Sequence, residues 1–339
     1  MKKHHLPAAL LAAALAATGV AAHAQSSVTV FGTIDMGITH VTSDIGSNTG
    51  LSHSNANVSR LGFRGTEDLG GGWSAGFWLE TALAPDSGGV NAGFNRRATV
   101  SLMGPWGELR LGQDDSATFL NTLLFDPFLT NGVGGTNTFL LNGAPTIQIG
   151  NAISYFTPPG LGGFYGQVQH AFSERLNTDP TAGGEYNGVR LGWRTGGLHV
   201  AAAAATLQGI TQQQDQRFRN VGLSYDFGVA QPMLLWASHK VGQVQVRGLQ
   251  LGVKVPVGAG EIRASVARYD TVGSKADWRK FAIGYGHNLS RRTQLYATYA
   301  RLNNSSGAQR VISAQGLAAV PNVPGGHSNG YEAGMRHFF

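Results

Sequence analysis

The sequence of 339 residues lacks cysteine altogether. This absence excludes folds held by disulfides, zinc sites built from thiolates, and enzymes with a cysteine nucleophile. Charged residues are also scarce, because they make up 13% of the chain, about half of the usual share. Typical disordered chains are rich in charge and poor in apolar residues, so a chain with 42% hydrophobic residues does not fit that class.

Basic residues are in slight excess, with 25 lysines and arginines against 19 acidic residues and a net charge of +6. No long run of lysine or arginine occurs, and so few charges give little support for binding to nucleic acid. The H-E-x-x-H, Walker A and EF-hand patterns are absent too, so we expect no metal site, no cofactor and no nucleic-acid partner. Glycine, by contrast, is abundant, with 49 residues, about twice the ordinary share.

Residues 1–24 have the features of a secretory signal peptide. Lys2 and Lys3 form a basic start, residues 6–20 are apolar and rich in alanine, and Ala22 and Ala24 form an A-x-A cleavage site. The apolar segment is too short for a comfortable membrane span, which argues against the alternative of an N-terminal anchor. We therefore predict cleavage after residue 24, export across the inner membrane of a bacterium, and a single mature domain over 25–339. No later run reaches roughly 18 apolar residues, so no transmembrane helix is expected.

Apolar and polar residues alternate with a period of two in segment after segment. Leu249, Leu251 and Val253, for example, alternate with polar residues or glycine at 250, 252 and 254. This period is typical of β-strands and not of helices. The polar positions are mostly Gly, Ser, Thr, Asn and Gln with sparse Arg, and aromatic residues such as Trp193 and Tyr285 stand near segment ends. These features favour a membrane barrel with a wet interior over a soluble fold with an aromatic core.

Short turns and long polar stretches alternate between these segments, as in barrels with tight periplasmic turns and larger external loops. The long stretches cover 42–56, 84–93, 115–150, 173–184, 207–217, 272–277 and 303–327. The alanine run at 201–205 alone would favour a helix, but its flanks place it in a strand. We predict an all-β fold, a 16-stranded antiparallel transmembrane β-barrel. The strands are expected near 27–41, 57–68, 72–83, 94–104, 107–114, 151–158, 163–172, 185–195, 197–206, 218–228, 231–241, 246–257, 260–271, 278–288, 291–303 and 328–339.

Six stretches carry a family resemblance that covers essentially the whole mature chain. They are SVTVFGTIDMG at 27–37, SRLGFRGTEDLGGG at 59–72, NRRATVSL at 95–102, GELRLGQ at 107–113, NAISY at 151–155 and GMRHFF at 334–339. The chain resembles the trimeric general porins of β-proteobacteria, the neisserial-type porins. The resemblance implies a homotrimer in the outer membrane, in contact with lipid and lipopolysaccharide, through which small hydrophilic solutes diffuse passively, often with anion preference. It also implies that Phe339 is the terminal aromatic residue read by the barrel assembly machinery.

The stretch 115–150 is the longest connection between the expected strands, and it has no regular period. Loops of this length are usually functional or disordered. The resemblance makes it the third loop, folded into the lumen as the constriction of the pore. The alternative is a flap that lies outside the barrel.

The phase of the strands places four arginines on the lumen side of neighbouring strands. These are Arg60, Arg64, Arg97 and Arg110. We expect them to form a basic wall at the constriction, because the planar guanidinium group keeps its charge and can stack on other groups. Arg96 is out of phase, so it either reaches the membrane interface or bends inward at a bulge.

Acidic residues near the long connection would complete a transverse electric field across the constriction. The candidates are Asp114, Asp115 and Asp126, with Arg190, Lys254 and Arg263 as secondary charges farther along the lumen wall. The alternative for each of these residues is structural. In that case the charges neutralise one another or anchor the loop through salt bridges.

Two other functions fit the same barrel. An outer-membrane enzyme needs a nucleophile with a base, but the histidines His170, His199, His239 and His287 occur without a G-x-S-x-G pattern, and we expect no catalytic residue. A substrate-specific channel would carry a series of aromatic residues along the lumen. Phe31, Trp78, Tyr269 and Tyr296 have roughly that phase but form no obvious track.

Overall fold

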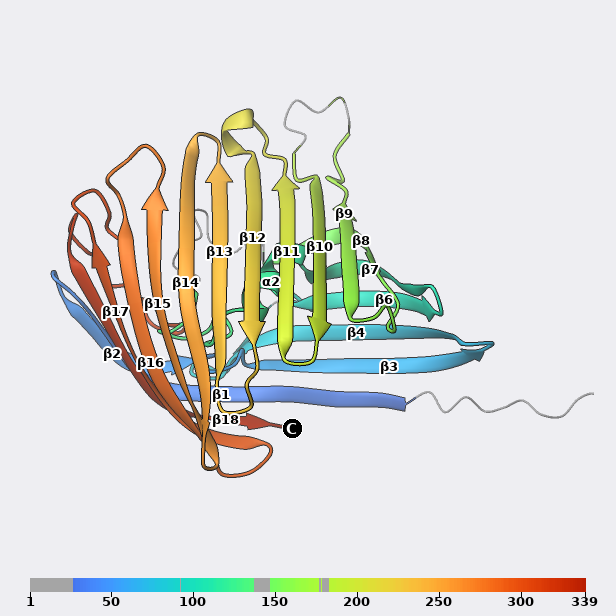
Figure 1. Cartoon of the computed structure of the whole chain (residues 1–339), viewed down its shortest axis with the longest axis horizontal. Coiled ribbons are helices and arrows are strands. Elements are labelled where there is room, and N and C mark those ends of the chain that lie inside the picture. Colours follow the sequence, from blue (N-terminus) through green and yellow to red (C-terminus); the bar gives the residue numbers. More distant parts are fainter. Residues whose placement is uncertain (1–26, 92, 137–146, 177, 179–182) are drawn as a thin grey trace, which may run out of the picture.

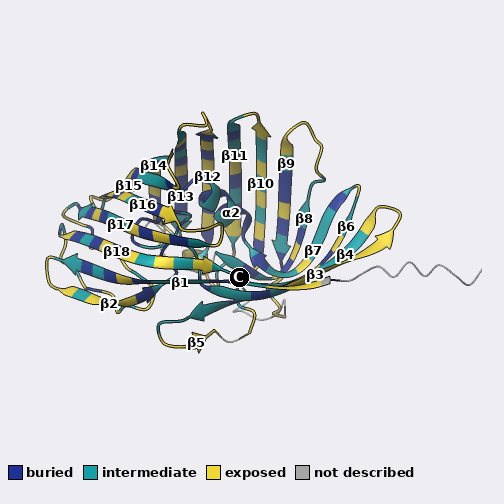
Figure 2. Ribbon diagram, turned by 90° about the horizontal axis from the view of Figure 1, so that it is seen from below, coloured by how far each residue is buried: buried dark blue, intermediate teal, exposed yellow. Residues whose placement is uncertain are grey.

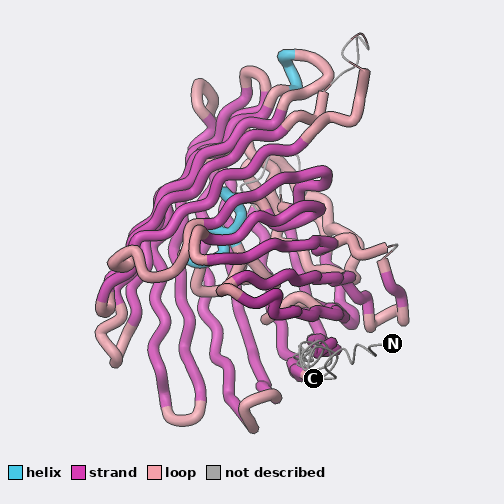
Figure 3. Tube along the Cα trace, turned by 90° about the vertical axis from the view of Figure 1, so that its right-hand side faces the viewer, coloured by secondary structure: helices cyan, strands magenta, loops and turns pink. Residues whose placement is uncertain are grey.

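The computed structural model describes residues 27–91, 93–136, 147–176, 178 and 183–339. The predicted signal peptide, residues 1–24, lies outside the described residues. The wall is one antiparallel sheet, and its first strand, β1 (Ser27–Ser43), pairs with its last, β18 (His327–Phe338). The sheet therefore closes into a barrel, which Figures 1 and 3 show from two sides.

The described chain contains eighteen strands, which make up sixteen strands of the barrel wall. The numbers differ because β2 (Ser47–His53) and β3 (Arg60–Gly70) pair with successive halves of β1, whereas β5 (Gly89–Val90) only forms a small hairpin with β4. The predicted 16-stranded antiparallel barrel is confirmed. The remaining strands are β4 (Trp73–Ala84), β6 (Arg97–Gly104), β7 (Gly107–Asp115), β8 (Gln148–Phe156), β9 (Phe164–Ala171), β10 (Tyr186–Thr195), β11 (Leu198–Leu207), β12 (Gln216–Tyr225), β13 (Gln231–Val241), β14 (Val244–Val257), β15 (Gly260–Thr271), β16 (Trp278–Asn288) and β17 (Thr293–Asn304).

Alternation along each strand separates the interior of the barrel from its outer surface. In β12 every second residue is buried, so that Phe218 and Asn220 point inward while Val221, Leu223 and Tyr225 are exposed. Figure 2 shows this alternation as bands of colour across β9 to β12. Apolar side chains exposed on the outside of a closed wall are suited to lipid. The period of two in the sequence therefore records which residues face lipid.

Pairing with neighbouring strands decides the structure of two ambiguous segments. The alanine run at 201–205 lies in β11, which pairs along its whole length with both β10 and β12. This pairing overrides the local preference of alanine for a helix. The long loop expected over 42–56 is wrong in its extent, because the chain reverses at 44–46 and returns at once as β2, paired with β1.

Two short helices occur among the described residues, α2 (Ala117–Leu124) and the 3₁₀ helix η2 (Gln212–Gln214). Figure 3 shows α2 on the inner side of the strands. Within the described ranges, no helix combines the length and the apolar character needed to cross a membrane.

Asp35 of β1 supports the break between β2 and β3, where Ser54 has a positive φ of 62°. The Asp35 side chain is fully buried, and its Oδ2 accepts hydrogen bonds from the backbone N–H groups of Ala56 (2.8 Å) and Asn57 (2.6 Å). Tyr296 of β17 donates its hydroxyl to the other carboxylate oxygen. These N–H groups have left the strand ladder, so the carboxylate supplies the acceptor that buried backbone groups require.

Replacing Asp35 with Ala should destabilise the folded barrel, because two backbone N–H groups and the Tyr296 hydroxyl lose their acceptor. A buried group left unsatisfied costs about 1–3 kcal/mol, so for these three groups we expect the free energy of unfolding to fall by about 3–9 kcal/mol. Urea titration of the barrel folded in detergent, followed by the shift between folded and unfolded bands on unheated gels, measures this loss.

The matched control is Asp68→Ala, which removes an exposed carboxylate that accepts one hydrogen bond from the Gly70 N–H. Its loss should stay below about 1 kcal/mol, because water replaces the partner. Equal losses in the two variants would contradict the structural role assigned to Asp35.

Candidate pore constriction

The chain turns into the barrel directly after β7. Ser116 caps α2 by accepting a hydrogen bond from the Phe119 N–H at 3.1 Å. On the lumen face of β12, Asn220 donates to the Thr118 carbonyl at 2.8 Å and accepts from Asn121 Nδ2 at 2.8 Å. The third loop, predicted over 115–150, is therefore folded inward over residues 116–136, which we call the inner loop. Residues 137–146 of the predicted loop lie outside the described residues, and positions 148–150 belong to β8.

Glycines on lumen-facing positions make room for the inner loop against the wall. A Cβ atom placed on Gly222 of β12 would lie 1.9 Å from Phe125 Cδ2, and one on Gly252 of β14 would lie 2.3 Å from Pro127 Cγ. Neither distance is compatible with an unshifted loop, so a larger residue at either position would displace it. Part of the high glycine content thus allows the inner loop to lie close to the strands.

Asp126 lies inside the inner loop and organises its turn. The carboxylate is fully buried and accepts hydrogen bonds from the N–H groups of Phe128 (3.0 Å), Thr130 (2.9 Å) and Thr136 (3.0 Å). Gln250 of β14 adds a contact to the same carboxylate at 3.3 Å. The structure therefore places Asp126 as a support of the loop backbone.

Two charged residues of the wall hold the tip of the inner loop. Glu332 of β18 accepts a hydrogen bond from the Val133 N–H at 3.0 Å, and Lys280 of β16 donates to the Gly135 carbonyl. Both charged side chains are only 5% exposed. The strand period places Lys280 on the lumen side. Alternation alone does not show which distant residue it contacts, so the sequence analysis missed the contact of Lys280 with the inner loop.

Residues 305–326, which we call the outer loop, lie over the tip of the inner loop. A cavity of about 430 Å³ separates them, lined by residues that include Thr130, Gly132, Lys280 and Arg310. The guanidinium carbon of Arg310 lies 4.6 Å from the ring centre of Trp278. Burial lowers the pKa of Arg310 from its ordinary value. The mouth of the pore is thus narrowed by two loops and carries a positive charge that was not among the sequence candidates.

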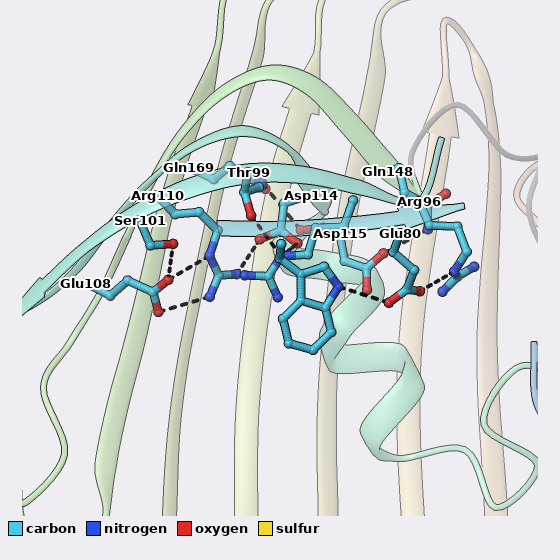
Figure 4. A network of polar contacts seen from close by, with 12 residues as sticks. Glu80, Arg96, Thr99, Ser101, Glu108, Arg110, Asp114, Asp115, Gln148 and Gln169 are labelled. Atoms are coloured by element: carbon cyan, nitrogen blue, oxygen red, sulfur yellow. Dashed lines mark hydrogen bonds and ion pairs between the residues drawn. The ribbon is translucent and has the colours of Figure 1, made fainter. Parts of the chain in front are cut away.

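Arg97 and Arg110 share carboxylates on the wall formed by β6 and β7. Arg110 Nε donates to Glu108 Oε1 at 2.9 Å, and its NH1 group binds Asp114. Arg97 Nε lies 3.7 Å from the other oxygen of Asp114. Figure 4 shows Arg110 between Glu108 and Asp114. The structure brings these predicted residues together as ion pairs, and it places Asp114 in β7 and not in the loop.

A second group centres on Glu80 of β4, which is 7% exposed in its side chain. Its Oε1 accepts from Arg96 Nε at 2.6 Å and lies 3.5 Å from Arg60 NH1, while its Oε2 accepts from Trp78 Nε1 at 3.1 Å. Arg96 therefore points into the lumen, which answers the question that its phase left open. Asp115, at the end of β7, lies near this group and accepts from Gln148 Nε2 at 2.8 Å (Figure 4).

Arg64 is held by aromatic rings, and among the described residues no carboxylate forms an ion pair with it. Its guanidinium carbon lies 5.2 Å from the ring centre of Phe31 and 5.1 Å from that of Trp78. The two rings contact each other edge to face at 4.9 Å. Such stacking fixes a guanidinium group without cancelling its charge.

The secondary charges and the remaining aromatic candidates lie elsewhere on the lumen wall. Arg190 lies 4.9 Å from the ring centre of Tyr165, and Arg263 binds Glu261 at 2.8 Å. Lys254 stands directly opposite Arg263 on the neighbouring strand. Tyr269 stacks on the Trp278 ring at 5.3 Å. In the described part of the chain, no group of three or more His, Cys, Asp or Glu side chains is placed to hold a metal ion.

Comparison with known protein families matches residues 9–307 to the Gram-negative porins. The chain belongs to the Gram-negative porin family. It is 37% identical over 350 residues to outer membrane porin protein 32 of Delftia acidovorans, covering 97% of this chain and 99% of the relative. It is 24% identical over 336 residues to the major outer membrane protein P.IB of Neisseria meningitidis serogroup B, covering 91% of this chain and 96% of the relative.

The fold is similar to a solved structure of the same family. An anion-selective porin from Comamonas acidovorans superposes with a TM-score of 0.84 and 35% identity, covering 93% of this chain and 100% of the other. These similarities confirm the resemblance to β-proteobacterial porins. The protein is accordingly a channel of the bacterial outer membrane and not an enzyme.

Replacing Glu332 with Ala should loosen the inner loop, because the buried Val133 N–H loses its acceptor. The cost of about 1–3 kcal/mol would raise the population of displaced loops about fivefold or more. We expect faster entry of large neutral sugars into liposomes and greater noise of the open channel in planar bilayers.

The matched control is Glu261→Ala, which removes the same charge from the lumen wall at β15, where the carboxylate binds Arg263. Neutral sugars report the width of the pore and not its field, so this variant should leave their rate of entry unchanged. Equal rates of sugar entry in the two variants would refute the anchoring role of Glu332.

Proposed function

We propose that the pore prefers anions and conducts small hydrophilic solutes by passive diffusion past an arginine-lined constriction. The observation that carries this proposal is the excess of positive charge on the lumen wall. Among the described residues, Arg64, Arg190 and Lys254 form no ion pair, whereas the wall carboxylates Glu80 and Glu108 are both bound by arginines. The net field therefore attracts anions.

The field at the narrowest part of a water-filled pore determines which ions pass. Low-dielectric walls focus the field of the fixed charges into the aqueous path. Ion pairs such as that of Arg110 with Glu108 contribute little net charge, so the unpaired cations dominate at a distance. Arg64 fits this role, because an arginine keeps its proton over the whole physiological pH range.

The similar structure from Comamonas acidovorans is named as that of an anion-selective porin. The identity of 35% over almost the whole chain supports the same preference here. We extend the proposal to the four primary arginines Arg60, Arg64, Arg97 and Arg110 as the basic wall, with Asp114 and Asp115 as the acids that shape its field.

The proposed partners follow from the family resemblance. We infer that three copies of the chain assemble in the outer membrane, in contact with lipid and lipopolysaccharide. Phe339 is proposed as the signal for the barrel assembly machinery, and its side chain is 45% exposed at the closing end of the wall. The signal peptide over 1–24 is part of the same proposal.

Replacing Arg64 with Ser should weaken anion preference, because the constriction loses an uncompensated charge. One charge about 5 Å from the ion path contributes about 0.8 kcal/mol in an aqueous dielectric, or a factor of about four in the permeability of a monovalent anion at low salt. The double variant R97S/R110S should have a larger effect, since it also leaves Glu108 and Asp114 unpaired. The zero-current potential in a salt gradient measures both.

The control of opposite sign is Glu80→Gln, which keeps the size of the side chain but frees the charges of Arg60 and Arg96. Its anion preference should rise above that of the unmodified pore. An unchanged zero-current potential in all three variants would contradict the proposal that the basic wall produces the anion preference.

The purified protein should insert into planar bilayers in groups of three equal conductance steps if it is a trimer. Unheated gels should then show a folded band at the mass of three chains. Single conductance steps together with a folded monomer band would count against the homotrimer and leave the pore function intact.

A further inference from the structure

A row of basic side chains lies on the outer surface of β12 to β17, where the pore does not use them. Six of the seven side chains are exposed, and Lys240 is half-buried. Every one of them alternates with residues that point into the barrel. We call this row the basic belt. Its members are Arg217, Arg219, Lys240, Arg247, Arg268, Arg279 and Arg301.

Strand register makes the basic belt continuous across six neighbouring strands. Arg217 stands directly opposite Lys240, and Arg268 stands directly opposite Arg279. Between these two pairs, Arg247 of β14 stands opposite Ser238 of β13 and Asp270 of β15. With neighbouring strands about 4.8 Å apart, the belt spans about 24 Å of the wall.

The basic belt lies at one end of these strands. It occupies the side where β13, β15 and β17 finish and where β12, β14 and β16 begin, the upper side of β12 and β13 in Figure 1. The outer loop follows β17 at this end, which is therefore the external end. At the opposite end the outward side chains are apolar or aromatic, such as Tyr225, Tyr285 and Leu295.

Charges of one sign dominate the belt to a degree that calls for a partner. On the outward face of β12 to β17, within the described chain, the one carboxylate is Asp270, which binds Arg268 at 2.7 Å. Like charges directly opposite each other on neighbouring strands destabilise a sheet. Asp270 partly compensates the pair of Arg268 and Arg279, whereas the pair of Arg217 and Lys240 has no outward carboxylate beside it among the described residues and is unfavourable until an anion lies against it.

We propose that the basic belt binds the phosphate groups of the glycolipid in the outer leaflet, the lipid A part of lipopolysaccharide. An arginine or lysine on a lipid-facing strand destabilises the barrel by only about 0–1 kcal/mol at the level of the headgroups. The same residue destabilises it far more at mid-membrane. Guanidinium groups bind phosphate through two parallel hydrogen bonds. The proposal rests on the outer-membrane setting of the proposed function and is independent of the selectivity of the pore.

Charge complementarity decides among the partners that could cover this surface. A second copy of the chain docked through the same belt would bring like charges together. A lipid that carries two phosphates on one headgroup can instead neutralise two neighbouring arginines, and several such lipids fit along about 24 Å of wall. The belt lies at the depth of the lipid headgroups. A site for a soluble anion would not need to lie at that depth, so the position favours a lipid.

The test compares two double variants of the full chain, purified in detergent. R217Q/R279Q removes one member of each like-charge pair in the belt. R291Q/R292Q removes two exposed arginines from the turn between β16 and β17, at the opposite end of the barrel. Native mass spectrometry and thermal unfolding then measure binding of bis-phosphorylated lipid A, dephosphorylated lipid A and inorganic phosphate.

We expect the belt variant to bind bis-phosphorylated lipid A about tenfold more weakly or worse, since one charge-assisted hydrogen bond accounts for about that factor. The turn variant should bind within about twofold of the unmodified protein. Dephosphorylated lipid A should bind weakly to all three proteins, and inorganic phosphate should neither raise their unfolding temperature nor compete.

Equal weakening in both variants, or equal binding of dephosphorylated lipid A, would overturn the proposal. So would a belt variant that changes its oligomeric state with lipid binding intact, because the belt would then contact another copy. If R217Q/R279Q does not fold, R247Q/R301Q carries the same test. Zero-current potentials of the folded variants should be unchanged, so failure here is separate from failure of the selectivity proposal.

Discussion

Closure of the sheet between β1 and β18 is the constraint on which the other features of the molecule depend. In hydrocarbon no water is available to hydrogen-bond the backbone, so a strand edge exposed to lipid would be very costly. A closed wall leaves no such edge and turns one face of every strand outward. The polar residues must then face the interior, where water fills the space that a soluble protein would use for its core.

A wet interior changes what holds the inner loop in place. Inside the barrel the loop is fixed by individual polar contacts and by close approach to glycine, and its residues Phe128 and Val133 also pack in a buried apolar cluster with Leu302 of the wall. Asp126 supports its turn from within, Glu332 holds its tip, and Gly222 lets Phe125 approach the wall. The position of the inner loop therefore depends on these few polar contacts together with apolar packing of its tip against the wall.

Sequence reasoning succeeded where the signal was local and failed where partners were distant. A period of two sufficed for the strands and for the lumen side of Arg97 and Arg110. The break at 54–59 depends on Asp35, about twenty residues earlier, and Glu332 meets Val133 across 199 positions of sequence. Alternation states which side of the wall a residue faces, and it carries no information about which side chain it meets there.

Arg96 is a residue whose direction the strand phase could not predict. It lies just before β6, where the strand phase no longer applies, and its direction is set by Glu80 on the neighbouring strand. Glu80 and Glu108 were not among the sequence candidates, although both have lumen phase, because strand phase alone does not show which arginine a carboxylate binds. Several charged residues of the wall thus neutralise one another in ion pairs. Arg64 does not, and its positive charge stays uncompensated.

The way a guanidinium group is held determines whether its field reaches the pore. An ion pair fixes Arg110 firmly, but the carboxylate of Glu108 cancels most of its charge a short distance away. Aromatic rings fix Arg64 between Phe31 and Trp78 and leave its charge intact. A wall that needs both rigidity and a net field therefore benefits from the two arrangements side by side, and Trp78 serves both, since it stacks on Arg64 and donates to Glu80.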